Sequence, residues 1–569
     1  MYVKVLARTP TLRGIDINIP SIIKFLYNRQ VLTANDFRQI YGVNKLNPPL
    51  NVSDIENVSK TLMSWLNSSK RIVIYGDYDA DGILSAYILY DFLYNVLNYK
   101  KVWVWLPSRF ADGYGLNSKN LAIISQFADA VITVDCGIRD EVLVEKFRNK
   151  LDFIIIDHHS LPDKLPKAPI IHLKYKNNKN YFDKVSAGFT VLKFVSFLAK
   201  YLNIQNIKYI EDHVARYFEF AAITLVTDVM PMINENRRLL KLAYQSINSH
   251  KYQANSYVSS DISSPFSLKF ISFLKNKKVY LNYKDFGFVI GPRLNAVGRI
   301  MDPNIAFSSV IAPDIYKFSI LDRINTVRRN LVKDLTNDAF ERLFQNKNAI
   351  LGYSTDLSEG IIGLIAGNYA KEYQKISIFC TNGQDGLIKC SGRSPKSVSI
   401  INILNKLDKE FNCFYKYGGH ANAAGFTLKS NVDIKVFWNY MNKILTSKHI
   451  LQDSYILVDD ILTPSKFDPH LVLSFKEFEP FGPQNDEYKI VLWGLLHSIK
   501  ESKNNQLILT LADFYDDNKL VDVYLFTNDL THFNIGSKLF VLGTGTTTSD
   551  GRVLFFGQKI IDKIKLILN

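Results

Sequence analysis

The stretch RIVIYGDYDADG, residues 71–82, decides the fold of this chain. An apolar run, Ile72–Tyr75, is followed directly by three aspartates at alternate positions, Asp77, Asp79 and Asp81. Folding gives no reason for such a cluster, because like charges this close repel and Asp is a poor former of strands and helices. A divalent cation that takes several oxygen ligands would explain it. The stretch therefore predicts a metal site at the carboxyl end of a strand.

The sequence around this stretch has the rhythm of a parallel α/β sheet. Short apolar segments alternate with amphipathic ones, such as a helix expected at 83–97. In sheets of this kind, ligands bind outside the carboxyl ends of the strands. Strands are expected at residues 71–75, 102–105, 130–134, 153–156 and 170–173.

Further acidic clusters lie farther along the chain. Asp135 follows the apolar run 131–134, Asp157-His158-His159 follows 153–156, and Asp228 lies in TLVTDVMP at 224–231. One Asp at a strand end is usually a cap or turn residue, but the ends of parallel strands converge on one edge, where these side chains can meet. Such a set can hold two metals that share a bridging carboxylate, as in phosphoryl displacement. Mixed carboxylate and imidazole ligands favour manganese or magnesium over structural zinc.

The rest of the chain divides into further regions. Spacings of three and four among apolar residues predict one long helix from Ile315 to Gln345, which at about 1.5 Å per residue would span roughly 45 Å. After the punctuation EPFGP at 479–483, five short strands suit an OB-like barrel. We expect these divisions: 1–45 without an assigned role, 46–265 as a parallel-sheet catalytic domain, 266–345 as a connector, 346–450 as a smaller α/β domain, and 451–569 as the barrel domain.

Composition limits the class of protein. The 569 residues are 47% hydrophobic and contain no run of 18 apolar residues, so we expect neither a membrane span nor a membrane partner. The four cysteines show no paired spacing, which argues against a disulfide framework or a zinc ribbon and fits the reducing cytoplasm. The net charge of +15 favours polyanions, nucleic acid first, although a compositional bias toward Lys and Asn explains such a charge equally well.

The acidic motifs, in this order, resemble those of the DHH phosphoesterases, and most closely those of the family's single-stranded-DNA exonucleases. The resemblance covers the chain from about residue 45 to the end. It includes further motifs: RFADGYG at 109–115, GPRLNAVGR at 291–299, SGRS at 391–394, GGHANAAG at 418–425, and EPFGP at 479–483. The Asp-His-His triplet alone would also admit inorganic pyrophosphatases and cyclic-dinucleotide phosphodiesterases.

The resemblance implies a role for each acidic position. Asp79 and Asp81 would each bind one metal, and Asp135 would bridge the two. His158 and Asp228 would be further ligands, whereas Asp77 and Asp157 would be direct or outer ligands. His159 would touch the scissile phosphate or orient the nucleophile. A water activated by the metals would attack phosphorus while the metals offset the growing charge. The expected catalytic residues are Asp135, His158 and His159.

A second set of residues is expected to bind phosphate. Gly418, Gly419 and His420 read as a backbone cradle, since glycines let N–H groups approach an anion. The forked guanidinium of Arg393, beside Ser391, suits phosphate oxygens. Three more arginines lie in glycine-rich loops, although a solvated surface charge is the other reading for each of them: Arg109, Arg293 and Arg299. In the barrel, aromatic residues suit base stacking, although several must belong to its core: Trp493, Tyr515, Tyr524 and Phe526.

The expected activity is metal-dependent hydrolysis of single-stranded DNA, which the resemblance implies runs 5′ to 3′, releases mononucleotides and serves recombination and repair. It also implies a monomer, with single-stranded-DNA-binding protein and a RecQ-type helicase as partners. Two alternatives stay open: a DHH phosphodiesterase of short RNA or cyclic dinucleotides, which would not need the barrel, and a non-catalytic replication scaffold, which would have lost metal ligands. The chain departs from many relatives at Ser358-Glu359, where they carry Trp-His.

Overall fold

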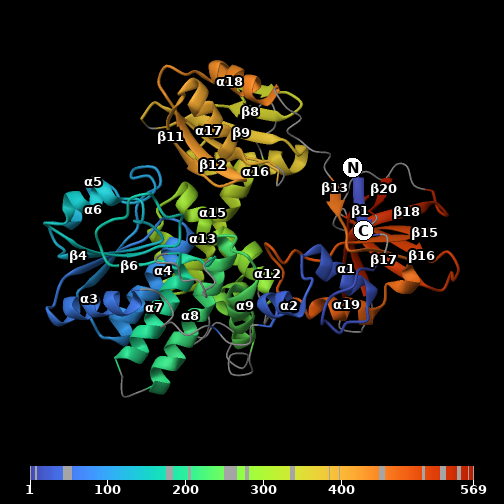
Figure 1. Cartoon of the computed structure of the whole chain (residues 1–569), viewed down its shortest axis with the longest axis horizontal. Helices are drawn as coiled ribbons and strands as arrows, with labels where there is room; N and C mark the ends of the chain where they lie inside the picture. The colour runs from blue at the N-terminus through green and yellow to red at the C-terminus, as the bar shows by residue number, and fades with distance from the viewer. Residues whose placement is uncertain are drawn as a thin grey trace. The chain divides into compact units, whose positions relative to one another are not determined.

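The structure is a computed structural model of the whole chain (Figure 1). It forms two compact units: residues 1–46, 231–238 and 453–569 make one, and residues 47–230 and 239–452 make the other. No helix in the described ranges is long and apolar enough to cross a membrane. The structure describes residues 2–6, 9–42, 46, 54–174, 184–202, 207–248, 266–275, 281–333, 340–383, 385–395, 398–446, 455–502, 506–525, 534–547, 553–561 and 563–567.

The first sheet of the larger unit is entirely parallel and has the order β3-β2-β4-β5-β6. Its strands are almost continuously apolar, as expected for a sheet covered on both faces. The strand predictions for this sheet are therefore confirmed to within two residues. Its strands are β2 (Ile72–Tyr75), β3 (Val102–Trp105), β4 (Ala130–Val134), β5 (Asp152–Ile156) and β6 (Ile170–Ile171).

Helices cover both faces of this sheet. One face packs against α5 (Ser118–Ile124) and α6 (Glu141–Phe147). The helix that follows β2 begins earlier than expected, because Asp79 caps it: α4 spans Ala80–Asp91 and continues as a π-helical turn, Phe92–Val96. Helix α4 packs against α7 (Ala187–Tyr201) and α8 (Ile207–Thr227). Shorter helices complete this part of the chain: α3 (Ile55–Asn67), α9 (Asn234–Ile247), α11 (Phe266–Lys275) and α12 (Tyr283–Asp285).

The connector differs from its prediction. A π-helical turn, Phe286–Ile290, leads into α13 (Gly291–Ile300), α14 (Asn304–Ile311) and α15 (Ile315–Lys333). Helix α15 has 19 residues, about 28 Å, and the chain is in strand β7 by Arg342–Gln345. The prediction of one helix reaching Gln345 was wrong, because apolar residues continue at spacings of four as far as Phe344, whereas Arg342–Gln345 pair with β8 as a strand.

The second sheet of this unit has the order β11-β12-β10-β9-β8-β7 and is mostly antiparallel. One face packs against α16 (Glu359–Tyr373), and the other against α17 (Ile400–Phe411) and α18 (Ile434–Thr446). Strand β11 lies at the edge. The remaining strands are β8 (Ala349–Tyr353), β9 (Ile376–Asn382), β10 (Ile388–Arg393), β11 (Phe414–Gly419) and β12 (Ala423–Leu428).

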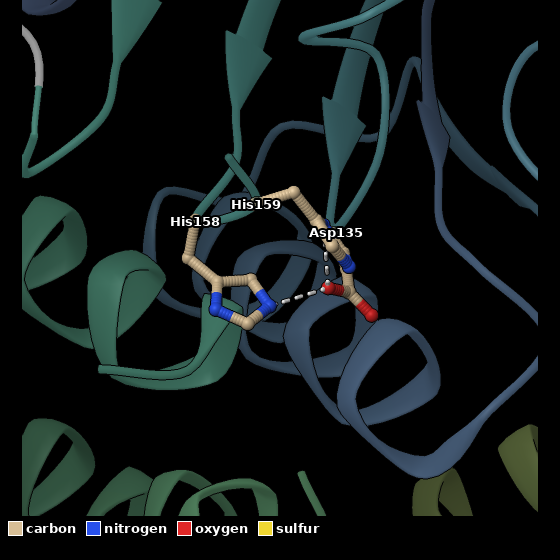
Figure 2. A group of neighbouring side chains, drawn as sticks. All are labelled: Asp135, His158 and His159. Atoms are coloured by element: carbon tan, nitrogen blue, oxygen red, sulfur yellow. Dashed lines mark ion pairs between the residues drawn. The ribbon is translucent and has the colours of Figure 1, made fainter. Parts of the chain in front are cut away.

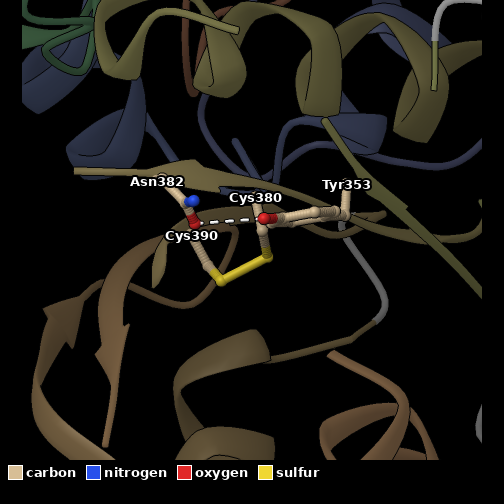
Figure 3. The surroundings of a disulfide bond; sticks show 4 residues. All are labelled: Tyr353, Cys380, Asn382 and Cys390. Atoms are coloured by element: carbon tan, nitrogen blue, oxygen red, sulfur yellow. Dashed lines mark hydrogen bonds between the residues drawn. A yellow bond between two sulfur atoms is a disulfide. The ribbon is translucent and has the colours of Figure 1, made fainter. Parts of the chain in front are cut away.

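Two of the four cysteines are paired, contrary to the expectation from their spacing. Cys380 of β9 and Cys390 of β10 are direct cross-strand partners and form a disulfide (Figure 3). Spacing along the chain could not show this pairing, because the register of two antiparallel strands brings the cysteines together. Cys136 and Cys413 are buried free thiols.

The smaller unit is built on a closed barrel in which β15 pairs with both β16 and β18, with the order β15-β16-β17-β19-β18. This is the OB-like barrel that the sequence predicted. Its strands are β15 (Ile490–Ser502), β16 (Gln506–Ala512), β17 (Leu520–Leu525), β18 (Lys538–Thr547) and β19 (Val553–Ile560), with β14 (Asp460–Leu462) added beside β15 and with a 3-10 turn Pro464–Lys466 and helix α19 (Pro469–Lys476) nearby.

The N-terminal residues, which had no assigned role, pack on this barrel. Strand β1 (Tyr2–Leu6) lies between β13 (Tyr455–Leu457) and β20 (Lys563–Ile567) in a parallel sheet. Helices α1 (Pro20–Asn28) and α2 (Ala34–Ile40) follow β1 along the chain. The ring of Phe25 in α1 contacts the rings of Phe475 and Phe478 in the hydrophobic core of the barrel unit.

Candidate metal centre

The loop after β2 is held in a tight shape by hydrogen bonds and by close packing. The Asp79 carboxylate caps α4 and accepts hydrogen bonds from the backbone N–H groups of Asp81 (2.9 Å) and Gly82 (3.2 Å). A Cβ on Gly82 would lie 2.4 Å from the backbone nitrogen of Asp77, so only glycine fits there. The three aspartates are therefore fixed at the start of one helix.

Helix α13 holds the same loop from outside. The Asn295 side chain accepts a hydrogen bond from the Ala80 N–H at 2.8 Å. A Cβ on Gly298 would lie 2.1 Å from the carbonyl oxygen of Tyr78. The GPRLNAVGR motif thus places a helix directly against the acidic loop. The motif is recognisable in the sequence, but the sequence predicted no role for Asn295 or Gly298.

Asp81 lies at the N-terminus of α7. Its buried carboxylate accepts hydrogen bonds from the N–H groups of Ala187 (2.9 Å) and Gly188 (2.8 Å), where the helix dipole favours negative charge. Burial and the charge of Asp79 nevertheless raise the pKa of Asp81 to about 7. The helix therefore orients this carboxylate without fully stabilising its charge.

Asp135 and Asp228 meet Asp81 around His158. The Nε2 atom of His158 lies 3.2 Å from Asp135 Oδ1, 3.5 Å from Asp228 Oδ2 and 3.6 Å from Asp81 Oδ2. Burial lowers the pKa of His158 to about 3, so the ring is neutral and its contacts are not ion pairs. Burial and the charges of Asp81 and Asp79 raise the pKa of Asp228 to about 9. Asp228 also follows the last residue of α8, where the helix dipole disfavours a carboxylate.

The donor set fits divalent cations. Among the residues that the structure describes, three groups have ligand atoms that lie within 4.8 Å of one another: Asp77 with Asp79 and Asp135, Asp81 with His158 and Asp228, and Asp135 with His158 and His159. Asp77 Oδ1, Asp135 Oδ1 and His158 Nε2 are buried without a hydrogen-bond partner, which is costly for atoms that no ion engages. Asp135 belongs to two of the groups, as a bridging carboxylate would. Figure 2 shows it beside His158 and His159.

Asp157 is placed differently from the other acidic residues. Its Oδ1 accepts hydrogen bonds from the N–H of His158 (2.7 Å) and from His159 Nδ1 (2.8 Å), and its Oδ2 accepts one from the N–H of Ile138 (3.0 Å). Both oxygens are thus engaged, and Asp157 is in none of the three groups. Although burial opposes it, the bond and charge of His159 hold the pKa of Asp157 below its usual range. The structure supports the outer of its two expected roles.

His159 is more exposed than His158: 26% of its side chain is accessible, against 9% for His158. Burial lowers its pKa, but the hydrogen bond from its ring to Asp157 and the charges of Asp157, Asp81 and Asp79 outweigh burial and raise it. The Tyr114 hydroxyl lies 3.2 Å from the His159 ring and 3.3 Å from the Asp135 carbonyl oxygen. Tyr114 is half exposed and was missed by sequence reasoning, since a tyrosine in a glycine-rich loop carries no signal of its own.

Three of the expected phosphate-binding arginines gather near the acidic loop. Arg109 donates to the Tyr78 hydroxyl (3.3 Å), and Arg299 donates to the Gly360 carbonyl of α16 (3.2 Å). Burial and the charges of Arg109, Arg328 and Arg393 lower the pKa of Arg299 to about 10, although Asp79 opposes them. Burial and the charge of Arg109 also lower the pKa of Arg393. These partly buried cations repel one another and suit an anion, although Asp77 and Asp79 also attract Arg109.

Arg293 is placed elsewhere. Its guanidinium pairs with Asp322 of α15 at 2.7 Å and donates to the Val289 carbonyl, so it fastens α13 to α15. Its expected role as a phosphate ligand therefore has no support from the geometry. Ser391 accepts a hydrogen bond from Arg393 (3.1 Å), and Gly363 of α16 leaves room for both side chains.

The expected cradle lies at the end of β11. A Cβ on Gly418 would meet no atom within 4 Å, whereas Gly419 has a φ of +148° and no room for a Cβ beside Ala424. The His420 N–H donates to the Ala423 carbonyl, so it is not available to an anion. Burial lowers the pKa of His420, and the charge of His159 lowers it further.

Comparison with known proteins agrees with this geometry. The model of the DHH family N-terminal domain matches residues 71–225, and that of the DHHA1 domain matches residues 346–447. The chain therefore carries a DHH domain followed by a DHHA1 domain. All the acidic motif positions of the expected metal centre fall inside the DHH match or within three residues of its end, and Ser391, Arg393 and the Gly418–His420 segment fall inside the DHHA1 match.

Relatives within the DHH family extend beyond these two domains. The chain is 26% identical to the single-stranded-DNA-specific exonuclease RecJ of Escherichia coli strain K12. The alignment spans 492 residues and covers 82% of each protein. It has the fold of RecJ from Thermus thermophilus in complex with Mn²⁺, with a TM-score of 0.76 and 19% identity over 99% of this chain and 80% of that one. The Mg²⁺ complex of the same protein gives a TM-score of 0.71.

Proposed function

We propose that this chain is a metal-dependent exonuclease that hydrolyses single-stranded DNA from 5′ to 3′, releasing mononucleotides, in recombination and repair. The observation that carries this proposal is the cluster of buried, unpartnered ligand atoms on Asp77, Asp135 and His158. The relatives named single-stranded-DNA-specific exonuclease and the fold shared with the Mn²⁺ and Mg²⁺ complexes support it.

The ligands divide between two ions. Asp77 and Asp79 would hold one, Asp81, His158 and Asp228 would hold the other, and Asp135 would lie between them. Two manganese or magnesium ions bound there would activate water and offset the charge that develops on the phosphoryl oxygens. Asp157 keeps the His159 ring turned toward the centre. Since its pKa is raised, His159 can donate a hydrogen bond to a phosphate oxygen.

The arginines supply a place for a terminal phosphate. Arg109, Arg299 and Arg393 are partly buried, and an anion would offset the repulsion that, together with burial, lowers the pKa values of Arg299 and Arg393. A terminal phosphate carries more charge than an internal one and fits such a pocket best. This supports attack from a phosphorylated end, and thus exonuclease rather than endonuclease action.

The test is a time course with manganese on one oligonucleotide labelled at each end in turn. With the label at the 5′ end, we expect labelled mononucleotide from the first turnover; with the label at the 3′ end, a ladder that shortens. The reverse pattern would overturn the polarity, and internal fragments would overturn exonuclease action. Equal rates on single-stranded and duplex DNA would exclude selectivity for single strands.

The two alternatives have less support. A scaffold without activity does not need ligands at every acidic position, and all of them are present here. A phosphodiesterase of short RNA or cyclic dinucleotides does not need the closed barrel, whose exposed Tyr515 and partly buried Tyr524 suit base stacking. The ring of Trp493 already stacks on Phe540, with 5.3 Å between the ring centroids, so Trp493 is less suited to stacking on a base. Phe526 lies outside the described residues.

We propose single-stranded DNA as the substrate and, from the family resemblance, single-stranded-DNA-binding protein and a RecQ-type helicase as partners of a cytoplasmic monomer. The domain divisions expected from the sequence belong to the same proposal. Co-purification of the tagged chain with either protein tests the proposed partners. The mass of the protein in solution tests whether it is a monomer.

A further inference from the structure

The edge strand of the DHHA1 sheet carries a bulge that changes which side chains share a face. Phe414 pairs with Leu428, but the next pair joins Lys416 to Thr427, so Tyr415 and Lys416 together oppose Thr427. A bulge of this kind redirects a side chain and is common beside active sites. Because of it, Tyr415 and Lys416 lie on the same face, instead of alternating.

The pairing across the sheet identifies that face. Cys390 and Phe426 are partners, and both belong to the core under α17 and α18. Their neighbours Ser391 and Gly425 therefore lie on the face of α16, and Gly363 of α16 contacts Ser391. Tyr415, Lys416 and Thr427 share this second face. Tyr417 pairs with Phe426 and lies on the first face, with its ring 5.1 Å from that of Phe414.

Two glycines leave the second face open between Lys416 and the metal centre. Gly418 pairs with Gly425, and a Cβ on either would meet no atom closer than 4.0 Å. We call this pair the glycine floor. In the next row toward the strand ends, Ala423 pairs with Arg393, and His420 follows in the turn beside it. The floor therefore separates the phosphate-binding end of the sheet from Tyr415 and Lys416.

The dimensions and charges of this surface fit a nucleic-acid strand. At about 3.3 Å per residue, Tyr415 lies roughly 17 Å from His420 along β11. Tyr415 is 70% exposed, and Lys416 is exposed beside it. Lys389 lies on the same face, paired with Asp385, and the charge of Lys416 acts on Glu359 at the start of α16. The cations Lys389, Lys416 and Arg393 outnumber the acids Asp385 and Glu359.

We propose that Tyr415 and Lys416 form a nucleotide subsite, in which one base stacks on Tyr415 while Lys416 binds the adjacent phosphate above the glycine floor. This inference rests on the proposed function for its substrate class. It adds a positioning residue outside the metal centre and the arginines. A flexible strand would thus be fixed at two points, the terminal phosphate and one stacked base.

The test measures binding to 5′-phosphorylated oligothymidylates with EDTA present, so that no substrate is consumed. Each oligonucleotide carries one abasic residue, at a different position from the 5′ end. For the wild-type chain, we expect one position to weaken binding about tenfold, the size of a lost base–aromatic stack. Tyr415→Ala should weaken binding of the intact strand by about the same factor and be insensitive to the abasic residue at that position.

Two controls make the result specific. Tyr415→Phe keeps the ring and should bind as the wild type does. Tyr373→Ala removes a partly exposed tyrosine at the end of α16, away from the floor, and should change nothing. The subsite is refuted if Tyr415→Ala binds normally, or if its loss is the same at every abasic position.

A parallel cleavage assay with manganese separates this inference from the proposed function. If the protein hydrolyses the strand but its binding does not depend on Tyr415, the subsite alone is refuted. If binding depends on Tyr415 but the protein hydrolyses nothing, the exonuclease proposal alone is refuted.

Discussion

At the scale of single residues, the carboxylates of the acidic centre repel one another, and bound cations would relieve this repulsion. Asp77 and Asp135 are buried, and burial together with the charges of neighbouring aspartates raises the pKa of each well above its usual range. No hydrogen bond reaches one oxygen of each. Backbone N–H groups position Asp81 and Asp157, but nothing in the described part of the protein neutralises the cluster as a whole.

A first prediction concerns pH. The raised pKa values of Asp81 (about 7) and Asp228 (about 9) mean that, in metal-free protein at neutral pH, Asp228 is mostly protonated and Asp81 is protonated about half of the time. Metal binding requires the deprotonated forms and must release these protons. We therefore expect the affinity for Mn²⁺ to rise from pH 6 to pH 9. Calorimetry at pH 7 in two buffers of different ionisation enthalpy should show proton release, and heats independent of the buffer would contradict it.

A second prediction concerns Asp157. In Asp157→Asn, the hydrogen bond that orients His159 is weakened while the ligand groups keep their members. Loss of such an outer partner typically costs about 10- to 100-fold in activity or metal affinity. Turnover with saturating manganese should fall by that factor. Asp163→Ala, an exposed aspartate on the following loop, is the control and should keep full activity. A total loss of bound metal in Asp157→Asn would show that Asp157 is a direct ligand.

At the scale of elements, the centre depends on helices that press against one loop. Helix α4 begins at the loop, α7 presents its N-terminus to Asp81, and α13 touches the carbonyl oxygen of Tyr78. The metal ligands are thus positioned by backbone packing as much as by side chains.

Gly298→Ala tests the contact of α13 with the loop. The added methyl group would lie 2.1 Å from the Tyr78 carbonyl oxygen, so the helix or the loop must move. Overpacking of this kind costs about 1–3 kcal/mol, and we expect a lower melting temperature together with weaker metal binding. Gly367→Ala in α16 is the matched control: its Cβ would meet nothing, and it should stabilise the chain by up to about 1 kcal/mol. Equal effects of the two changes would contradict the role of α13.

The local pattern predicted elements well where one signal was strong. The apolar runs of β2, β4 and β5 are buried on both sides, so composition alone marks them as strands. The helix predicted as far as Gln345 failed at β7, since a few spacings of three and four persist by chance in a strand. The bulge at Tyr415 could not be predicted, because the register depends on the partner strand.

At the scale of the whole molecule, charge and topology bring distant segments into one site. Asp79, Asp135 and His158 come from separate segments, and the convergence of parallel strand ends made their meeting predictable. Asp228 joins them from the end of helix α8, which the strand pattern alone could not show. The packing of β1 between β13 and β20 had no such signal, because parallel partners far apart in sequence leave no local pattern. Arg293 and Arg299 look alike in sequence, and only the structure separates the one that pairs with Asp322 from the one that is left among cations.

The net charge of +15 predicts a marked salt dependence of binding. A single strand whose phosphates meet Arg109, Arg299, Arg393 and Lys416 would release counterions, with a slope of about −0.7 per phosphate in log affinity against log salt. We expect a total slope of roughly −3, reduced by about 0.7 in Arg393→Gln. Titrations between low and moderate salt measure it, and a flat response would contradict phosphate contacts.

The most direct test of the central claim is metal add-back to EDTA-treated protein. Wild-type chain and Asp135→Ala are each mixed with a 5′-phosphorylated single-stranded oligonucleotide, with and without manganese, while binding is followed separately. We predict mononucleotide release only from the wild type with manganese, and strand binding by both proteins. Hydrolysis in EDTA, or by Asp135→Ala at the wild-type rate, would contradict a metal centre bridged by Asp135.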